Sequence, residues 1–255
     1  MKKIGLLFLC FFSLLSFDVR ALGFEQNFNV RVGIFDAAEV VISYENKNDL
    51  YDISAKVKTA NFFGGIYPFL GVYKARGKVL KNGVLPTVYD TKTESRSNIR
   101  TKKILYQDGI AYKRISSKND KTNEVSINNI PKTVNASDLQ TVFAELINNF
   151  SKKRDCALLR EIYDGKKHYK VIAENKGVEN RWFDYMNKAQ NAYKCSVYIE
   201  NLKQNNDNIL WEISAETPIN LWLDVKKDGN MPKILEISID STPLGGVQVT
   251  PIDYN

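Results

Sequence analysis

The sequence predicts a mainly β protein: a curved antiparallel half-open β-barrel or β-spiral with one amphipathic helix packed in its concave face. Three observations predict this class. Apolar and polar residues alternate in short segments along most of the chain, which is typical of strands with one buried face. Asn-Gly and Asp-Gly pairs separate several of these segments, and such pairs favour tight hairpin turns. A single segment has the apolar spacing of an amphipathic helix.

The alternating segments are predicted to form hairpins in chain order. The turns lie at residues 46–49, 81–83, 108–109, 164–165 and 227–230. About a dozen strands at this spacing imply a sheet that curls or closes, since long flat edges invite aggregation. The predicted strands are residues 39–44, 51–57, 72–80, 85–93, 104–107, 110–115, 158–163, 168–173, 192–200, 209–215, 219–225, 234–239 and 247–252.

The helix is predicted to begin near Ser137, which forms a capping-box pattern with Gln140. It is predicted to end near the basic residues 152–154, which suit the negative end of a helix dipole. We interpret its apolar stripe as packing against the concave face of the sheet, with a docking surface as the alternative. The stripe consists of Leu139, Val142, Phe143, Leu146, Ile147 and Phe150.

Two other segments interrupt the strand pattern. Residues 181–188 have a weaker helical pattern, and residues 116–134 are polar and are predicted to form a long loop. This loop separates an N-terminal meander, ending at about residue 115, from a helix and C-terminal meander over residues 135–255. No segment resembles a domain linker, so residues 22–255 are predicted to form a single β-rich domain.

The first 21 residues predict export across a membrane. Two lysines precede an apolar run over residues 4–17, and the small-residue pattern Val19-Arg20-Ala21 follows it. The run is shorter than the ~20 residues that a spanning helix needs, so we interpret residues 1–21 as a signal peptide; a retained anchor is the alternative. Cys10 lies inside the run, so no lipid-modified cysteine is expected at its end. The predicted location is the periplasm, with no permanent membrane span.

Charge says little about partners. The net charge of +7 falls to +5 without residues 1–21, which hold three basic residues and one acidic one. A surplus this small favours solubility and does not predict a nucleic-acid partner. Short basic clusters occur at residues 102–103, 152–154, 166–167 and 226–227. They are interpreted as solvated faces, with contact to anionic lipid or glycan as the alternative.

Without the predicted signal peptide, Cys156 and Cys195 are the cysteines that remain. In an oxidising compartment they are expected to form a disulfide, which closes a loop that the chain-entropy model values at roughly 4 kcal/mol. Two reduced buried thiols are the alternative. A regular meander would separate the two strands by about 9–10 Å, too far for a disulfide. Cys156 is therefore expected to precede its strand, on a segment that folds back over the strand of Cys195.

Catalytic and metal-binding motifs are absent from the sequence. His168 is the single histidine, which excludes His-rich metal sites, and it is interpreted as an ordinary strand residue. No Gly-x-Ser-x-Gly elbow, Cys-x-x-Cys pair, phosphate loop or dinucleotide fingerprint occurs. No catalytic residue, metal or cofactor is predicted. A pair of carboxylates on two strands would leave no sequence signature.

The most unusual segment is residues 61–73, with five aromatics, three glycines and a proline. Such a composition interrupts both regular strands and long helices. We interpret it as a crossover that caps one end of the barrel, or as the rim or lid of an apolar cleft that binds a ligand. The candidate ligand-binding residues are Phe62, Phe63, Tyr67 and Phe69, with Trp182 and Phe183 at the same mouth.

Several short motifs also occur in the order found in a known family. They are Val30-Arg31-Val32-Gly33, Tyr67-Pro68-Phe69, the turn at residues 163–169 with a cysteine on either side, and the closing segments 218–223 and 242–245. Over residues 28–250 the chain resembles the bacterial envelope proteins of domain-of-unknown-function family 3108. The resemblance implies a periplasmic half-open β-barrel, distantly similar to the lipoprotein carriers LolA and LolB. It implies no established activity.

These observations lead to one functional expectation and two alternatives. The expected function is a soluble cell-envelope protein without catalysis that binds a lipid or acyl chain, a lipoprotein segment or an envelope protein partner. The alternatives are a periplasmic hydrolase that uses carboxylates and a purely structural scaffold. A cleft with apolar walls favours binding, and two carboxylates that face each other favour catalysis.

Overall fold

The computed structural model describes residues 22–127, 137–163, 168–201, 217–224, 231–243 and 245–252. The predicted signal peptide, the predicted strand at residues 209–215, and the predicted turns at 164–165 and 227–230 lie outside these ranges. None of the helices in the described ranges is long and apolar enough to cross a membrane.

The described strands form one antiparallel sheet of 14 strands, which confirms the predicted class. Its order is β8-β7-β6-β5-β4-β3-β2-β1-β14-β13-β12-β11-β10-β9, so two meanders join where β1 pairs with β14. The first meander contains β1 (Leu22–Val32), β2 (Phe35–Lys47), β3 (Leu50–Thr59), β4 (Phe69–Leu80), β5 (Gly83–Ser95), β6 (Asn98–Gln107), β7 (Ile110–Lys118) and β8 (Lys121–Ser126). The second contains β9 (Leu158–Tyr163), β10 (His168–Phe183), β11 (Lys188–Asn201), β12 (Ile219–Asp224), β13 (Ile234–Ile239) and β14 (Val247–Pro251).

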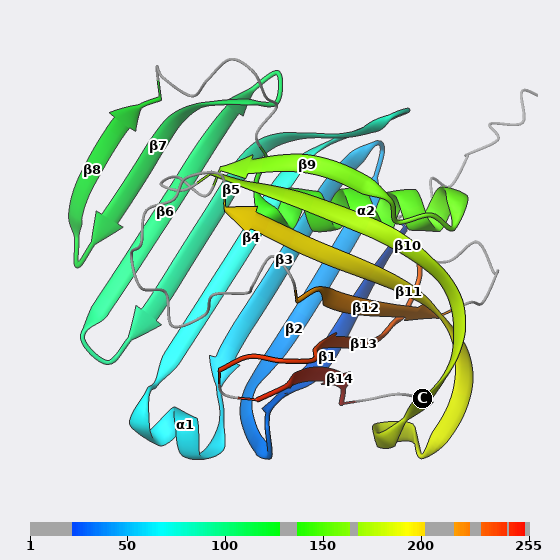
Figure 1. Cartoon of the computed structure of the whole chain (residues 1–255). Helices are drawn as coiled ribbons and strands as arrows, with labels where there is room; N and C mark the ends of the chain where they lie inside the picture. Colours follow the sequence, from blue (N-terminus) through cyan, green and yellow to red (C-terminus); the bar gives the residue numbers. More distant parts are fainter. Residues whose placement is uncertain are drawn as a thin grey trace, which may run out of the picture.

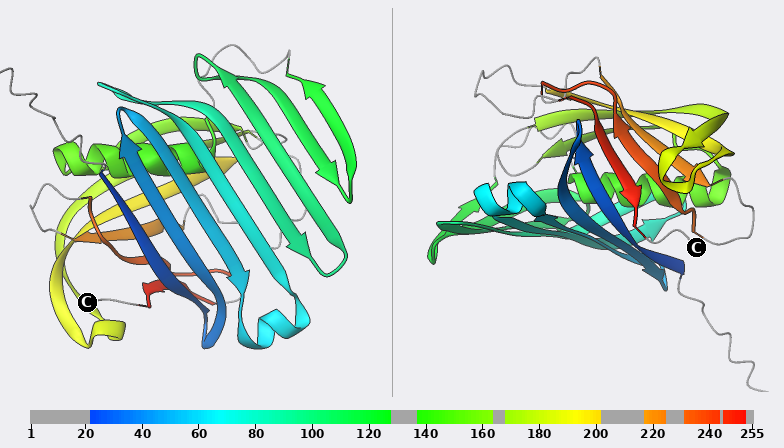
Figure 2. Two further views of the ribbon diagram at one scale, coloured as in Figure 1. Left: turned by 180° about the vertical axis from the view of Figure 1, so that it is seen from behind. Right: turned by 90° about the horizontal axis from the view of Figure 1, so that it is seen from below.

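The sheet curves so that the second meander covers part of one face of the first (Figure 1). Viewed from below, the two meanders form two layers with a helix between them (Figure 2, right). The ends of the sheet, β8 and β9, do not pair with each other, and the barrel stays open. This is the half-open arrangement that the strand spacing predicts.

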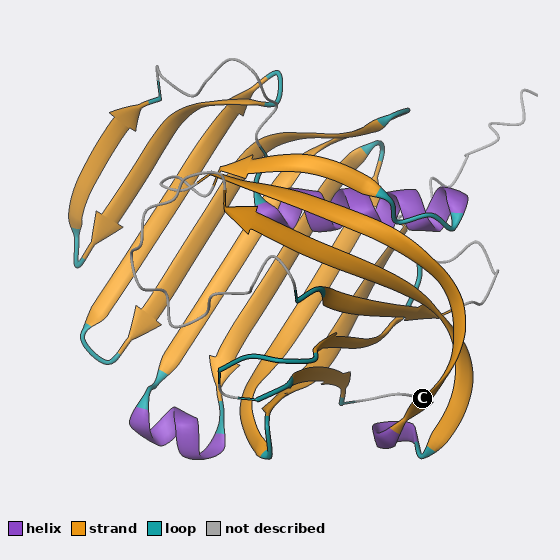
Figure 3. Ribbon diagram, in the orientation of Figure 1, coloured by secondary structure: helices purple, strands orange, loops and turns teal. Residues whose placement is uncertain are grey.

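The helix between the layers is α2 (Leu139–Lys153), with the extent that its apolar spacing predicts. It contacts β3, β4 and β5 of the first layer and β9 of the second (Figure 3). Phe150 has no exposed surface and meets the Tyr193 ring edge-on, with the ring centres 5.0 Å apart. Val142 packs in a second cluster with Ile162 and Val171. The helix thus fills the concave face and forms the centre of the core.

The N-terminus of α2 differs from the predicted capping box. Asp138, not Ser137, is the N-cap residue, and its carboxylate accepts a hydrogen bond from the backbone N–H of Thr141. Ser137 instead forms an isolated parallel bridge with Ile162 of β9. Because the backbone of Ser137 bonds to that strand, it is not placed as a cap.

Three predicted segments need correction. Residues 116–126 belong to β7 and β8, so the N-terminal meander extends past residue 115 and the predicted loop at 116–134 is wrong over this part. The helix predicted at 181–188 is one 3-10 turn, Asp184–Met186, between β10 and β11. Residues 61–73 form no crossover: α1 (Asn61–Ile66) joins the adjacent strands β3 and β4. For residues 69–73, 116–126 and 181–183, pairing with a neighbouring strand outweighs local composition.

Cys156 and Cys195 form a disulfide with their Cα atoms 6.2 Å apart. As the strand spacing predicts, Cys156 precedes β9, and its segment passes over an irregularity in β10. There Asn175 is opposite Cys195, and its side-chain amide donates to the Arg154 carbonyl oxygen. The disulfide therefore ties the end of α2 to the middle of the second layer.

Candidate functional site

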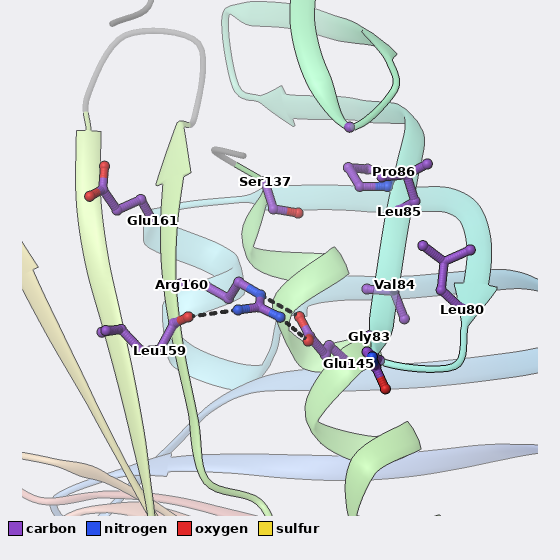
Figure 4. Close-up of a pocket in the computed structure, with 12 residues that line it drawn as sticks. Leu80, Gly83, Val84, Leu85, Pro86, Ser137, Glu145, Leu159, Arg160 and Glu161 are labelled. Carbon is purple, nitrogen blue, oxygen red and sulfur yellow. Dashed lines mark hydrogen bonds and ion pairs between the residues drawn. The ribbon is translucent and has the colours of Figure 1, made fainter. Parts of the chain in front are cut away.

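A pocket of about 360 Å³ opens where the two layers and the helix meet. It lies between the β4–β5 turn of the first layer, strand β9 of the second layer and the first turns of α2 (Figure 4). This volume is within the range of roughly 300–1,000 Å³ that is typical of small-molecule sites. The pocket is the candidate functional site.

One wall of the pocket is apolar. Val84, Leu85 and Pro86 of β5 line it, with Leu80 of β4 beside them. Leu80 is 47% exposed and Leu159 57% exposed, so the rim of the pocket carries large apolar side chains that are only partly covered by described residues. Exposed apolar side chains around a concave site favour an apolar ligand over a fully polar one.

The opposite wall carries an ion pair. The guanidinium of Arg160 on β9 donates from Nε to Oε2 of Glu145 (2.8 Å) and from Nη2 to Oε1, and Nη1 donates to the Leu159 carbonyl oxygen (2.9 Å). The Glu145 side chain is 4% exposed and that of Arg160 is 38% exposed. Since a guanidinium has five N–H groups, two remain for another acceptor. The pair therefore presents an oriented, nearly neutral hydrogen-bond donor to the pocket.

The β4–β5 turn reaches the ion pair closely because it contains glycine. Gly83 has φ +138°, and a Cβ atom there would lie 2.9 Å from Oε1 of Glu145 and 3.4 Å from Nη2 of Arg160. The Asn82-Gly83 turn that the sequence predicts thus has two requirements for glycine, a positive φ angle and a close approach.

Ser137 supplies the third polar group of the pocket. Its backbone N–H donates to the Glu161 carbonyl oxygen (3.0 Å), and its own carbonyl oxygen accepts from the Tyr163 N–H (2.8 Å). These bonds fix Ser137 at the free edge of β9. Its hydroxyl is buried, lines the pocket and has no hydrogen-bond partner within the described residues. Figure 4 shows this side chain beyond the Glu145–Arg160 pair, facing Leu85 and Pro86.

Behind the pocket, a buried hydrogen-bond network joins the helix start to the first layer. Thr141 Oγ1 donates a hydrogen bond to Asp138 Oδ2 (2.7 Å). The Tyr51 hydroxyl lies 2.8 Å from Thr141 Oγ1 and donates to it, because the single proton of the Thr141 hydroxyl is already used. Burial raises the pKa of Asp138 to about 6, while the hydrogen bonds from the backbone N–H and the hydroxyl of Thr141 act in the opposite direction. Burial also raises the pKa of Tyr51 and Tyr106 above the usual tyrosine range.

This network predicts a pH dependence of stability. Because the pKa of Asp138 is about 6 when folded and 3.8 when unfolded, the folded state binds the proton more tightly. The free energy of unfolding should therefore fall as the pH rises from about 4 to about 6. At 1.36 kcal/mol per pKa unit, the expected fall is about 3 kcal/mol. Asp138→Asn should remove this slope and keep the cap, since Asn caps helices as well as Asp. Urea unfolding across this pH range measures the difference.

The matched control is Asp49→Asn, an exposed turn residue with a positive φ angle that suits Asn. The control should unfold with the same pH profile as the unaltered protein. Equal slopes for the unaltered protein and Asp138→Asn would show that Asp138 titrates normally and would contradict the buried network.

The six sequence-predicted ligand residues lie in two separate groups in the structure. Phe62, Phe63, Tyr67 and Phe69 lie on or beside α1; Phe62 and Tyr67 are exposed, and Phe63 and Phe69 are half-buried. Trp182 and Phe183 lie at the far end of the β10–β11 hairpin, Trp182 exposed and Phe183 buried against Trp222. Figures 1 and 2 show α1 and the end of this hairpin on opposite sides of β1 and β2. None of the six residues lines the pocket described above.

The pocket residues had a weak signal in the sequence. Arg160 has the same strand phase as the apolar residues Leu158 and Ile162, and Glu145 lies beside Leu146 in the predicted helix. A charge at an otherwise apolar strand position indicates that Arg160 is paired, whereas Glu145 lies outside the predicted apolar stripe of the helix and carries no such indication. That these two charges meet depends on the fold of the second layer over the first, which no local pattern encodes.

Comparison with known proteins shows the fold alone. No family model matches the chain, so none supports the resemblance to family 3108, and no curated protein matches it either. Among solved structures, the chain is similar to a β-barrel-like protein of the domain of unknown function DUF1849 from Brucella abortus. That match has 9% sequence identity and a TM-score of 0.50, and it covers 91% of this chain and 96% of the other.

Proposed function

We propose that this protein is a non-catalytic binding protein of the cell envelope that holds an acyl chain in the pocket between its layers. The chain would lie against Leu80, Val84, Leu85 and Pro86, and its carbonyl or carboxylate end would accept hydrogen bonds from Arg160. The observation that carries the proposal is the combination, in one pocket, of an apolar wall and an oriented donor with unused N–H groups.

The polar end of the ligand is inferred from the balance of charge. Glu145 neutralises Arg160, so hydrogen bonding and not net charge holds the polar end of the ligand; two guanidinium N–H groups and the Ser137 hydroxyl remain unused by described partners. Acceptor oxygens on an otherwise apolar molecule complement this arrangement. A carboxylate and an ester carbonyl share that chemistry, and the experiment below compares the two.

Binding is favoured over hydrolysis because the carboxylates near the pocket already have partners. Glu145 is paired with Arg160, and Oε2 of Glu161 lies 2.9 Å from Nε2 of His168. Figure 4 shows Glu161 on the other side of β9 from Arg160, so the two carboxylates do not face each other. A two-carboxylate mechanism needs such a pair on either side of the reacting bond.

The envelope location in this proposal rests on the sequence and on the disulfide. Residues 1–21 have the pattern of a secretory signal. A buried disulfide between Cys156 and Cys195 is typical of proteins that fold in oxidising compartments. Fusion of residues 1–30 to a reporter that is active only outside the cytoplasm tests the location, and an inactive reporter would contradict it.

Calorimetric titration with dodecanoate and with methyl dodecanoate tests the binding site. We expect both to bind, because both carry acceptor oxygens. Replacement of both members of the pair, Glu145→Met with Arg160→Met, should weaken binding at least about tenfold. Such a replacement by apolar residues of similar volume is often neutral for stability, so loss of binding would not reflect unfolding.

The matched control is the double variant Arg181→Met with Glu236→Met. This pair joins at 2.6 Å on β10 and β13, away from the pocket, and its side chains are 32% and 5% exposed. The control should bind dodecanoate like the unaltered protein. Absence of binding to the unaltered protein, or equal binding by both double variants, would overturn the proposed site.

A further inference from the structure

Exposed apolar side chains gather at one end of the strands of the first layer, the end opposite the pocket. In an antiparallel meander alternate turns lie at the same end of the strands, so the β1–β2 turn, α1 and the β5–β6 turn are neighbours there (Figure 1). Ile34 is 86% exposed, Tyr67 70% and Phe62 67%. We call this surface the apolar edge; it consists of Ile34, Phe35, Phe62, Ile66, Tyr67 and Ile99.

Packing and a backbone hydrogen bond hold the side chains of the apolar edge in place. The half-buried Phe63 ring meets Phe35 and Phe62 edge-on, with ring centres 6.2 Å and 5.9 Å away. The N–H of Gly33, beside Ile34, donates to the Gly246 carbonyl oxygen (2.8 Å), which holds the β1–β2 turn against the second layer. The side chains that project outward are therefore presented in fixed positions.

Cations surround the apolar edge. The same turns and strand ends carry five exposed basic residues that have no ion-pair partner within the described ranges: Lys58, Arg96, Arg100, Lys118 and Lys121. Arg96 lies directly beside α1, because its Nη2 donates to the Gly65 carbonyl oxygen. Of the acids at the same strand ends, Asp36 and Glu94 are paired with Arg31 and Lys92. Glu39 is opposite Lys58 in the β2–β3 register, and Asp120 and Asp240 lie at the β7–β8 and β13–β14 turns. These three acids form no ion pair within the described ranges, so cations remain in excess at this edge.

We propose that the apolar edge docks on the surface of an anionic membrane. Ile34, Phe62 and Ile66 would enter the boundary between headgroups and acyl chains, Tyr67 would lie at the headgroup level, and the surrounding cations would contact lipid phosphates. Isoleucine and phenylalanine bury apolar area in this boundary, tyrosine is amphipathic and suits it, and basic residues add attraction to anionic lipid.

The shape and charge of the edge favour a membrane over a protein partner. Figure 1 shows α1 projecting from the lower end of the sheet, and the hollow of about 330 Å³ beside it has charged walls that include Lys58, Glu94 and Arg96. Charged residues are generally depleted at the core of protein interfaces, whereas cations around protruding apolar side chains match an anionic bilayer. The proposal is independent of the pocket, which lies at the other ends of β4 and β5.

Sedimentation with vesicles tests this docking. Protein would be mixed with vesicles of phosphatidylcholine alone, or of phosphatidylcholine with phosphatidylglycerol, at low and high salt. We expect binding to the anionic vesicles that decreases with salt. Ile34→Ser with Phe62→Ser should lower the bound-to-free ratio at least about tenfold, and Lys58→Gln with Arg96→Gln should lower it at low salt only.

The matched control is Leu50→Ser with Val178→Ser, which removes exposed apolar side chains elsewhere on the sheet and should bind like the unaltered protein. All of these positions are exposed, so their substitution should leave the fold intact, which circular dichroism verifies. Failure to bind anionic vesicles, equal loss in the control, or self-association without vesicles that Ile34→Ser with Phe62→Ser abolishes would each overturn the proposal. Dodecanoate binding should be unchanged in these variants, which separates this result from the pocket test.

Discussion

Phe150→Ala is expected to lower the free energy of unfolding by about 3–5 kcal/mol, the usual loss when a fully buried phenylalanine is truncated. Phe150 has no exposed surface and lies where α2 meets the second layer. It packs edge-on against Tyr193, and the Arg154 guanidinium lies 5.4 Å from its ring centre. The substitution would leave a cavity between helix and sheet, which the two layers on either side prevent from collapsing.

Urea unfolding followed by tryptophan fluorescence measures this loss. Phe143→Ala is the matched control, because Phe143 lies on the same helix and is only half-buried. It should lose clearly less stability than Phe150→Ala. Equal losses for the two variants would contradict the position of α2 between the layers, since that position is what makes the burial of the two residues unequal.

Removal of the disulfide is expected to have an effect of similar size. Cys156 and Cys195 are 39 residues apart in sequence, and closing such a loop stabilises a fold by roughly 4 kcal/mol in the chain-entropy model. The double variant Cys156→Ala with Cys195→Ala should therefore unfold at a much lower urea concentration. A reducing agent should lower the midpoint of the unaltered protein and leave that of the double variant unchanged.

This second prediction also tests the topology. Cys156 reaches Cys195 because its segment precedes β9 and passes over the β10 irregularity near Asn175. Two free thiols in the unreduced, denatured protein would show that the segment does not take this course. A reducing agent that left the unfolding midpoint of the unaltered protein unchanged would lead to the same conclusion.

The sequence predicts the fold well where the pattern is local. Alternation and turn pairs locate most strands of both meanders, and the spacing of Val142, Leu146 and Phe150 locates α2. The helix is nevertheless more buried than one apolar stripe implies, because two layers enclose it. Thr141, Glu145 and Asn148 are also buried, while Leu139 of the predicted stripe is exposed. Local periodicity identifies one buried face and not a second layer on the other side.

The pocket was not predictable from the sequence, for a related reason. Aromatic side chains attract attention as ligand-binding candidates, and the sequence therefore pointed to α1 and to the β10–β11 hairpin. The pocket instead depends on Arg160 and Glu145, which are 15 residues apart in sequence and meet only because β9 folds over the helix. Its close packing also depends on Gly83. The turn at Asn82-Gly83 was predictable, but the residues it approaches were not.

Photolabelling tests the central claim, that the pocket binds an acyl chain, most directly. The protein would be irradiated with a dodecanoate analogue that carries a diazirine at the end of its chain, and the labelled peptides would be identified by mass spectrometry. We predict labelling of the segment Leu80–Pro86 and of Leu159 that excess dodecanoate abolishes. Competed labelling at Phe62, Tyr67 or Trp182 in place of these residues, or no competed labelling at all, would contradict the account.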